Sequence, residues 1–248
     1  MLNILGESMP SEMSQSYQPP QSYHEQARDH MVVCQLQPVG VSDAKILESF
    51  ASVPREFFTL DKKDKNISEE DLSAVYLDQD CAIGNGRYLM EPSVHARLLQ
   101  VAAPKKDDVV LDIGSATGYS CAILSPLVST IVALDFDQSL LEVAEQNLET
   151  LGVCNVVSKV GEHQEGCKEH APYSLIVVNG AVGEVPPTLL DQLGPDGRLV
   201  CVIKDSNDMI GRAVLYMRGQ DNSYSQRVLF DASIPYLPGL EAASSFAF

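Results

Sequence analysis

The chain has 248 residues, with 34 acidic and 17 basic side chains and a formal net charge of −17. Nucleic acids and anionic membrane surfaces bind clusters of Lys and Arg, so this charge argues against both as partners. The sequence contains no apolar run near the roughly 18 residues that cross a bilayer and no signal-peptide pattern, so we expect no membrane association.

Cysteine usage indicates the compartment. The six cysteines include no CxxC pair, and several lie within apolar segments. This usage is typical of a reducing compartment, where cysteine serves as a small buried residue, so we expect a cytoplasmic protein. The five histidines are also scattered along the chain, and the sequence therefore predicts no metal site.

The first 27 residues are rich in Ser, Gln and Pro, a composition typical of a disordered polar arm. The remaining residues, 28–248, are predicted to form the folded domain. Near its start, residues 43–58 carry apolar side chains at helical spacing. Ser42 is a plausible N-cap for this helix and Pro54 marks its end.

A loop with paired glycines, IGNGRYLMEP at residues 83–92, follows a mixed-charge segment at 61–73 to which we assign no chemistry. Glycines two apart keep backbone freedom for a turn or for closeness to a ligand. After the loop, residues 92–103 place apolar side chains on one face of a helix, and Pro92 suits its first turn. Residues 31–103 are therefore predicted to form a helical subregion interrupted by this glycine loop.

From residue 107 the pattern changes to apolar runs of strand length that alternate with helical segments. The predicted strands are residues 109–113, 129–135, 155–160, 174–179 and 198–203. This alternation indicates an α/β fold with a mostly parallel sheet and helices on both faces. Two further runs, at residues 213–218 and 224–230, flank the turn sequence GQDNS and predict a C-terminal antiparallel hairpin.

The first strand of this sheet ends in a turn of small residues. In an open parallel sheet, ligands bind beyond the carboxyl ends of the strands. There the chain runs through Gly114 to Gly118, where backbone N–H groups can approach a ligand and a helix N-terminus follows. Asp135 closes the second strand and could accept both hydroxyls of an adenosine ribose. Asp112 could meet an ammonium group through water.

The same turn distinguishes between two nucleoside ligands. A dinucleotide turn has the pattern GxGxxG, in which the middle glycine lets a pyrophosphate approach the backbone. This sequence has GxAxGY instead. S-adenosylmethionine (SAM) carries a sulfonium and an ammonium but no phosphate, so the turn favours SAM over NAD. The alternative is a tight strand-to-helix connection that binds no ligand.

Several segments of the chain, taken in order, form a recognisable set of sequence motifs. VLDIGSATGYS is followed by ALDFD, VGEHQEG and APYSLIVVNGAVGEVPPTLLDQLGPDGRLV, and VPREFF and the loop glycines stand upstream. Together these segments resemble the protein-L-isoaspartate O-methyltransferase family of SAM-dependent enzymes, over residues 31–203. The resemblance implies a Rossmann-like SAM-dependent methyltransferase fold.

The resemblance also implies which residues hold the cofactor. Those expected to hold the methionine part of SAM are Asp112, Gly114, Ser115 and Gly118. Those expected to hold the ribose and flank the adenine are Asp135 and Phe136. Glu162 and His163 stand where the family has an acidic residue and a small residue beside the adenine.

The substrate loop departs from the family. The family's loop has the form IGxGQTISxP, and its Gln, Thr, Ile and Ser are replaced here by Arg87, Tyr88, Leu89 and Met90. The lost serine hydroxyl lies beside the reacting carboxylate in the family. A carboxylate is ionised at neutral pH, so methyl transfer to it depends on orientation and desolvation and requires no general base. Arg87 and Tyr88 are therefore the predicted catalytic residues, as donors that position the carboxylate. The alternative is that Arg87 pairs with a surface acid such as Glu91.

The function that these observations favour is a SAM-dependent carboxyl O-methyltransferase that acts on isoaspartyl residues of damaged peptides and proteins, as a repair enzyme. One alternative keeps the cofactor and changes the acceptor, because the loop that should contact the substrate is the part that differs. Another is an inactive SAM-binding module, and a dinucleotide oxidoreductase comes last. The sequence leaves the oligomeric state open.

Overall fold

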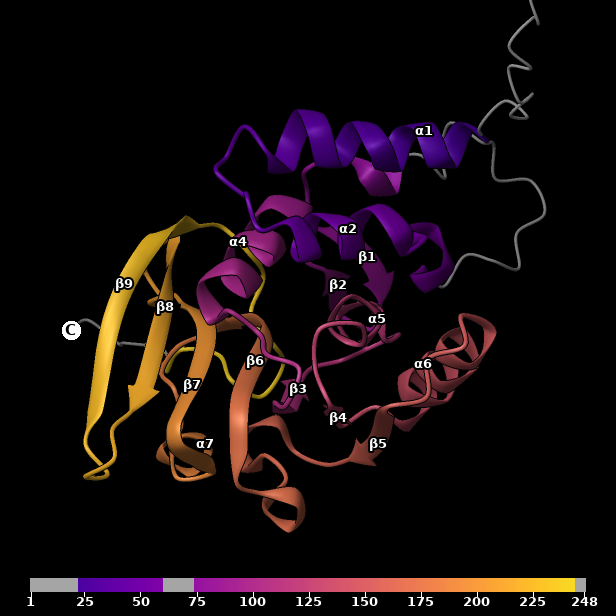
Figure 1. Cartoon of the computed structure of the whole chain (residues 1–248). Helices are drawn as coiled ribbons and strands as arrows, with labels where there is room; N and C mark the ends of the chain where they lie inside the picture. Colours follow the sequence, from indigo (N-terminus) through magenta and orange to yellow (C-terminus); the bar gives the residue numbers. More distant parts are fainter. Residues whose placement is uncertain (1–21, 60–73, 244–248) are drawn as a thin grey trace, which may run out of the picture.

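The structure, a computed structural model, describes residues 22–59 and 74–243. Residues 1–21 of the predicted polar arm (1–27) and the mixed-charge segment at 61–73 lie outside the described residues. Within the described part, a twisted seven-stranded sheet is flanked by helices on both faces (Figure 1). None of the helices in this part is both long and apolar enough to cross a membrane.

The strands of the sheet lie in the order β5-β4-β3-β6-β7-β8-β9. The first five in this order run parallel, and β8 and β9 follow as antiparallel neighbours. Their bounds are β3 (Val109–Ile113), β4 (Thr130–Asp135), β5 (Val156–Val160), β6 (Tyr173–Val182), β7 (Leu193–Ile203), β8 (Gly211–Arg218) and β9 (Tyr224–Ala232). The predicted α/β class, with its mostly parallel sheet and C-terminal antiparallel hairpin, is confirmed.

Strand β6 is longer than the predicted segment 174–179, because its end pairs with β7 on one side and with a distant part of the chain on the other. Ala181 N donates a hydrogen bond to Pro235 O at 2.8 Å, and Leu237 N donates one to Ala181 O at 2.8 Å. The pattern of an isolated segment contains no information about such a partner.

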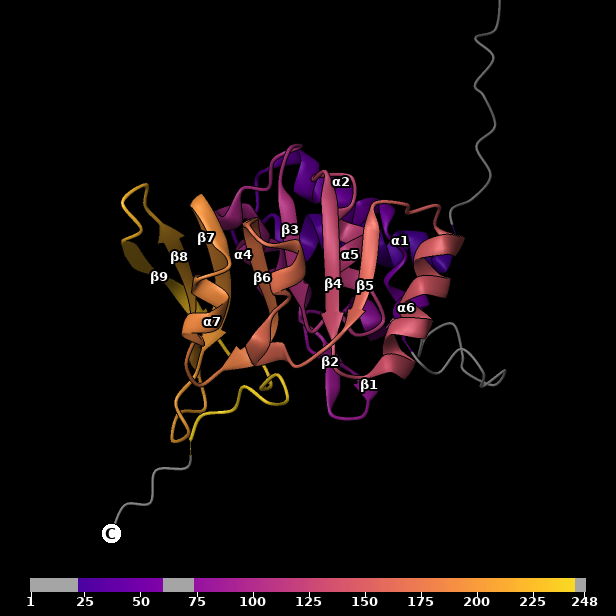
Figure 2. The same ribbon diagram turned by 90° about the horizontal axis from the view of Figure 1, so that it is seen from below.

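Helices cover the two faces of the sheet unequally. One face of the sheet is covered by the helices nearest the N-terminus. These are α1 (Tyr23–His30), the π-helical turn η1 (Met31–Leu36), α2 (Ala44–Ser52), α4 (Pro92–Ala102) and α5 (Tyr119–Leu124). Helix α6 (Gln138–Thr150) flanks β4 and β5, and the short α7 (Pro187–Leu190) lies on the opposite face (Figure 2). Short 3₁₀ turns are η2 (Arg55–Phe58), η4 (Ala74–Tyr76), η5 (His163–Glu165) and η6 (Lys168–His170).

Side chains alternate between these faces along each strand, as the two-residue period of a strand requires. In β3, Val110 belongs to the apolar cluster under α2, α4 and α5. Its neighbours Leu111 and Ile113 belong to a second cluster that includes Leu189 of α7 and Leu237. The chain therefore builds one core on each side of the sheet.

Local side chains determine where the first helices begin. Ser22 and Glu25 form a reciprocal capping box, so α1 begins at Tyr23, earlier than the domain boundary predicted from composition. Asp43, and not the predicted Ser42, caps α2 through its carboxylate. A carboxylate has more acceptor capacity than a hydroxyl and can accept two backbone N–H groups at once.

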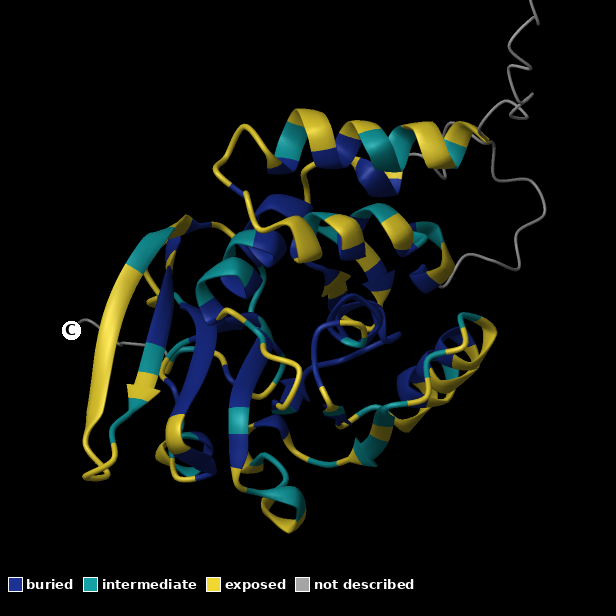
Figure 3. Ribbon diagram, in the orientation of Figure 1, coloured by how far each residue is buried: buried dark blue, intermediate teal, exposed yellow. Residues whose placement is uncertain are grey.

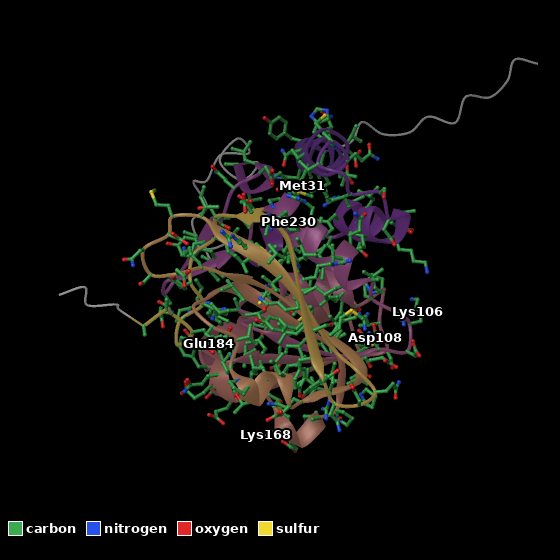
Figure 4. All side chains as sticks on the ribbon, turned by 90° about the vertical axis from the view of Figure 1, so that its left-hand side faces the viewer. Met31, Lys106, Asp108, Lys168, Glu184 and Phe230 are labelled. Atoms are coloured by element: carbon green, nitrogen blue, oxygen red, sulfur yellow. The ribbon has the colours of Figure 1, made fainter. Side chains whose placement is uncertain are left out.

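The edge strand β9 is largely exposed, whereas the inner strands are buried (Figure 3). Phe230 of β9 packs partly against the N-terminal core that includes Met31, and both are labelled in the view onto this edge (Figure 4). The guanidinium carbon of Arg97 lies 3.5 Å from the centroid of the Phe230 ring. A cation over an aromatic face is attractive, and this contact ties the edge strand to α4.

The segment predicted as the substrate loop is a small hairpin. β1 (Cys81–Gly84) pairs with β2 (Arg87–Leu89) in antiparallel fashion. Asn85 and Gly86 form the turn, with φ of 52° and 69°. Positive φ at both central residues is the requirement of a tight hairpin turn, which Asn-Gly satisfies. The hairpin lies beside the carboxyl end of β4 (Figure 2).

Candidate active site

The strand order creates a crevice beyond the carboxyl end of β3. The chain passes from β3 to β4 and β5 on one side, and then returns to place β6 on the other side of β3. Loops leave in opposite directions at such a point, and ligands of open α/β sheets bind there. The predicted turn and Asp135 both lie at this place.

The glycine turn after β3 has the backbone that its sequence requires. Gly114 has φ of 73° and Gly118 has φ of 93°, in the left-handed region that favours glycine. A Cβ on Gly118 would also lie 3.1 Å from Ala144 Cβ, so glycine lets α6 pack close to the turn. Gly114 N donates a hydrogen bond to Leu134 O at 2.8 Å, which ties the turn to β4.

Asp135 at the end of β4 is fully buried and has several donors. Ala116 N donates to Oδ2 at 2.9 Å and Asp137 N donates to Oδ1 at 3.1 Å. The Nη1 of Arg87 donates to both oxygens, at 2.8 Å and 2.7 Å. Both partners of this ion pair are buried, with 2% and 0% of the side chain exposed.

The electrostatics of Asp135 follow from these contacts. Burial opposes ionisation of the carboxyl, but the neighbouring His163 and Arg87 outweigh burial and lower its pKa to about 2. Arg87 is the closer of these two neighbours, because His163 Nε2 lies 3.6 Å from Oδ1, too far for a hydrogen bond. Asp135 is therefore a carboxylate at every physiological pH.

Asp112 on β3 is also fully buried, but its donors come from other side chains. Ser120 Oγ and Asn179 Nδ2 donate to Oδ1 at 2.7 Å and 2.9 Å, and Cys121 Sγ donates to Oδ2 at 3.1 Å. Burial raises its pKa, and these hydrogen bonds oppose the rise. Asn179 was not among the predicted site residues; its signal was its place as a polar residue at the end of a strand.

The residues predicted around the adenine are only partly brought together. Phe136 is 40% exposed, and its ring centroid lies 5.0 Å from that of the buried His163. His163 Nδ1 is 2.9 Å from Pro238 O. Glu162 precedes this histidine as an exposed residue, and none of the contacts in the described structure joins it to Asp135.

The space beside Gly114 tests whether SAM fits. The acceptors and backbone geometry that a SAM site needs are present, and Ser115 Oγ is buried without a hydrogen-bond partner among the described residues. However, the position of a Cβ on Gly114 lies only 2.6 Å from Leu237 Cδ1 and 3.1 Å from Arg87 Nη2. The cavity left between Arg87, Asn179 and Leu237 measures about 10 Å³, enough for about one water molecule. These polar groups suit the cofactor, while the side chains of Leu237 and Arg87 occupy the space that it would fill.

Comparisons with known proteins agree with this geometry. The sequence model described as Protein-L-isoaspartate(D-aspartate) O-methyltransferase matches residues 27–239. A Protochlamydia amoebophila relative named protein-L-isoaspartate O-methyltransferase is 36% identical over 176 residues, which are 71% of this chain and 80% of the relative. A Methanospirillum hungatei relative of the same name is 28% identical, over 81% of this chain and 88% of the relative.

The chain belongs to the protein-L-isoaspartate O-methyltransferase family.

Solved structures named for the same family share the fold. One protein-L-isoaspartate O-methyltransferase superposes with a TM-score of 0.73 at 28% identity, over 86% of this chain and 67% of that chain. A Plasmodium falciparum protein, described as a putative member in complex with S-adenosyl-L-homocysteine, superposes with a TM-score of 0.66 at 20% identity, over 86% and 97%. The predicted family and methyltransferase fold are confirmed, and the match extends beyond the predicted limits of 31–203 at both ends.

The predicted catalytic residues of this family member lie on β2. Arg87 points into the crevice and pairs with Asp135, and not with Glu91 as the alternative had it. Tyr88 is 40% exposed and lines the rim of the small cavity. Met90, at the position of the family's serine, is buried and lines the same cavity. Their roles in catalysis remain predictions.

Among residues 22–59 and 74–243, one group of potential metal ligands lies at the turn η6. The ligand atoms of Cys167, Glu169 and His170 lie within 4.8 Å of one another. Glu169 is exposed and already pairs with Lys159 at 3.0 Å. The positions of the histidines in the sequence did not predict this cluster. The short turn η6 brings the three residues together, and their spacing in the sequence matches no common metal-binding motif.

Proposed function

We propose that this chain methylates the free carboxyl group of L-isoaspartyl residues in peptides and proteins, with SAM as the methyl donor. The observation that supports this most directly is the family match over residues 27–239 together with the buried Asp135 at the carboxyl edge of the sheet. When bound, SAM supplies an electrophilic methyl group on its sulfonium. The chain's own residues then have to orient an acceptor carboxylate and exclude water.

Binding of the cofactor would use the residues of the crevice. Asp135 would accept the ribose hydroxyls, and the turn from Gly114 to Gly118 would lie against the methionine part, with Ser115 Oγ as an additional polar contact. Phe136 and His163 would lie near the adenine, whereas the exposed Glu162 has the weakest support. Asp112 would act through Asn179, to which it is hydrogen-bonded.

Arg87 and Tyr88 are proposed to position the acceptor carboxylate. An isoaspartyl carboxylate is ionised at neutral pH, so it needs donors that hold it in line with the methyl group and no base. A guanidinium can grip a carboxylate with two charged hydrogen bonds. Tyr88 lines the same cavity as Arg87 and could add a hydroxyl donor.

A different acceptor is the second candidate, and the hairpin favours it. Met90 places a buried apolar side chain where the family has a serine hydroxyl, and Tyr88 adds an aromatic ring at the rim. A larger and more apolar rim would favour an acceptor molecule in which a different chemical group lies next to the carboxylate. An inactive SAM-binding module is the third candidate.

A methyl-transfer assay tests the proposal. The chain is incubated with methyl-labelled SAM and an isoaspartyl peptide, with the aspartyl peptide of the same sequence as the control. We expect base-labile methyl ester on the isoaspartyl peptide only. Ester at the level of the aspartyl control would contradict the proposed acceptor, and transfer to members of a metabolite panel instead would favour the second candidate.

The expected cytoplasmic location is also part of this proposal. It is supported by the six cysteines, none of which forms a disulfide bond within the described residues. Exclusion of nucleic acid as a partner continues to depend on the net charge of −17.

A further inference from the structure

Arg87 fills the part of the crevice that the proposed cofactor needs. Its Nη1 bridges both oxygens of Asp135, at 2.8 Å and 2.7 Å, and its Nη2 donates to Gly114 O at 2.9 Å. The same guanidinium thus contacts the ribose acceptor and the first glycine of the turn. These two groups are 21 positions apart in the sequence, one in the turn after β3 and one at the end of β4, so Arg87 bridges the crevice between the two strands beside Leu237.

Asp135 has no acceptor left for a ribose while Arg87 is in place. A ribose presents two neighbouring hydroxyls, which donate to the two oxygens of a carboxylate. Here each oxygen already accepts from Arg87, and each also accepts from a backbone N–H, of Ala116 or of Asp137. The backbone donors hold the carboxylate in position, so Arg87 is the donor that can be exchanged for a ribose.

We infer that Arg87 is an internal latch that competes with the cofactor's ribose for Asp135. The inference builds on the cofactor part of the proposed function. The latch is charged and almost completely buried, with 2% of the side chain exposed, so it is a built contact and not a loose surface pair. Cofactor binding then requires the β1–β2 hairpin to withdraw Arg87.

The hairpin is suited to such a movement. β2 has three residues, and its pairing with β1 is irregular between Ala82 and Gly84. At the turn, Asn85 Nδ2 donates a hydrogen bond to Asp137 Oδ2 at 3.1 Å. The base of the hairpin is anchored instead by the buried Leu89 and by Arg55, whose guanidinium donates to Leu89 O and Met90 O. Short two-stranded ribbons are marginally stable by themselves, so the turn and the Arg87 side chain can move while the base of the hairpin stays in place.

The latch also links the two substrates of the proposed reaction. In the latched position Nη1 of Arg87 is turned to Asp135 and Nη2 to Gly114 O, so Arg87 can offer these two groups to an acceptor carboxylate only after it leaves Asp135. The cofactor, by taking Asp135, would free Arg87 for the acceptor at the rim of the same cavity. The two ligands should therefore bind cooperatively, and such coupling is reciprocal.

Calorimetric titration with S-adenosylhomocysteine tests the latch. Arg87→Gln installs the residue of the family's loop and removes the charged competitor, so the dissociation constant should fall by about tenfold or more, because the open form no longer has to be populated against the ion pair. Arg87→Lys keeps the charge but loses the contact geometry, and should lie between the two. Arg212→Gln, on the exposed part of β8, is the matched control and should leave the constant unchanged.

A second titration tests the coupling. In the native chain, a saturating concentration of S-adenosylhomocysteine should tighten binding of an isoaspartyl peptide by about fivefold or more. In Arg87→Gln this dependence should disappear, while the peptide itself binds about tenfold or more weakly, because a charged hydrogen bond is lost. One substitution should thus change the affinities for the two ligands in opposite directions.

The outcomes separate the latch from the proposed function. If both Arg87 variants bind S-adenosylhomocysteine as weakly as the native chain or more weakly, the latch is wrong, whatever the methyl-transfer assay shows. If the variants bind S-adenosylhomocysteine more tightly but no ester forms on the isoaspartyl peptide, the latch is supported and the proposed acceptor is contradicted. Absence of heat in the native chain and in both variants overturns both. Urea unfolding of each variant shows whether it is folded. If Arg87→Gln does not fold, the titration of Arg87→Lys still tests the latch.

Discussion

Glu91 is the residue at which the substrate hairpin passes into α4, and it lies among other carboxylates. Asp80 accepts a hydrogen bond from Glu91 N at 3.0 Å, and Asp78 accepts one from Ser93 N at 2.9 Å. These two acids accept from N–H groups at the start of the helix that have no partner within the helix. Burial, followed by the charges of Asp80 and Asp78, raises the pKa of Glu91 to about 7.

The raised pKa of Glu91 predicts how stability depends on pH. Its folded pKa lies above its ordinary 4.5, so its contribution is complete below about 4.5 and is lost as pH rises through about 7. Glu91→Gln should therefore match the native chain near pH 4 and exceed its unfolding free energy near pH 8, as measured by urea denaturation at both values.

The comparison isolates Glu91 because other groups are common to both proteins. His95 acts in the opposite direction, since burial and then the charge of Arg55 lower its pKa to about 3. Its contribution is lost as pH falls below its ordinary 6.5. Equal differences between native and Glu91→Gln chains at both pH values would refute the assignment to Glu91.

At the scale of elements, Arg55 joins three segments that the sequence keeps apart. The fully buried guanidinium donates to Val75 O at 2.7 Å and to Met90 O at 2.9 Å, and more weakly to Leu89 O at 3.3 Å. It therefore holds the end of β2 against η2 and η4. The cation also lies 4.8 Å from the centroid of the Tyr119 ring at the start of α5.

Replacement of Arg55 should loosen the whole substrate subregion. Arg55→Met keeps an apolar stem but leaves buried carbonyl groups without donors, and we expect a loss of about 3–5 kcal/mol in unfolding free energy. Arg212→Met, at an exposed arginine, should change it by less than about 0.5 kcal/mol. Urea denaturation measures both, and a loss below about 1 kcal/mol for Arg55→Met would show that the hairpin does not depend on this residue.

At the scale of the molecule, the segment after β9 returns across the carboxyl edge and closes it. Its Leu237 packs beside Gly114, and Gly183 N donates to Leu240 O at 2.7 Å. The segment approaches β6 so closely that a Cβ on Gly180 would lie 3.0 Å from Leu237 N and 3.1 Å from its Cα. Glycine at position 180 therefore lets the two backbones meet.

Gly180→Ala should move the closing segment away from the sheet. The added methyl group meets backbone and cannot be accommodated by side-chain rotation, so we expect a loss of about 1–3 kcal/mol. Amide hydrogen exchange of residues 234–240 should accelerate while that of β3 and β4 stays unchanged. Gly194→Ala is the control, because its methyl group would meet Pro172 Cβ at an ordinary 3.5 Å. Unchanged exchange in the Gly180 variant would contradict this account of the segment.

Much of the fold and part of the site could be predicted from short stretches of sequence. The glycine turn after β3, the acid that ends β4 and the parallel strands between helices depend on residues that are neighbours in the chain. Backbone propensity, side-chain alternation and turn chemistry act over a few residues, so the sequence displays them directly. The family resemblance added the cofactor and the acceptor by analogy.

The partner of Arg87 could not be predicted in this way. The sequence offered Glu91, four positions away, whereas the structure pairs Arg87 with Asp135, which is 48 positions away. The same holds for Leu237 against Gly114 and for Arg55 beneath β2. Each contact depends on how separate elements pack once the sheet has formed, and buried charges and close backbones find their partners only there. Local sequence thus determined which elements form and where a nucleoside could bind, and the tertiary packing alone decided that an arginine already holds that place.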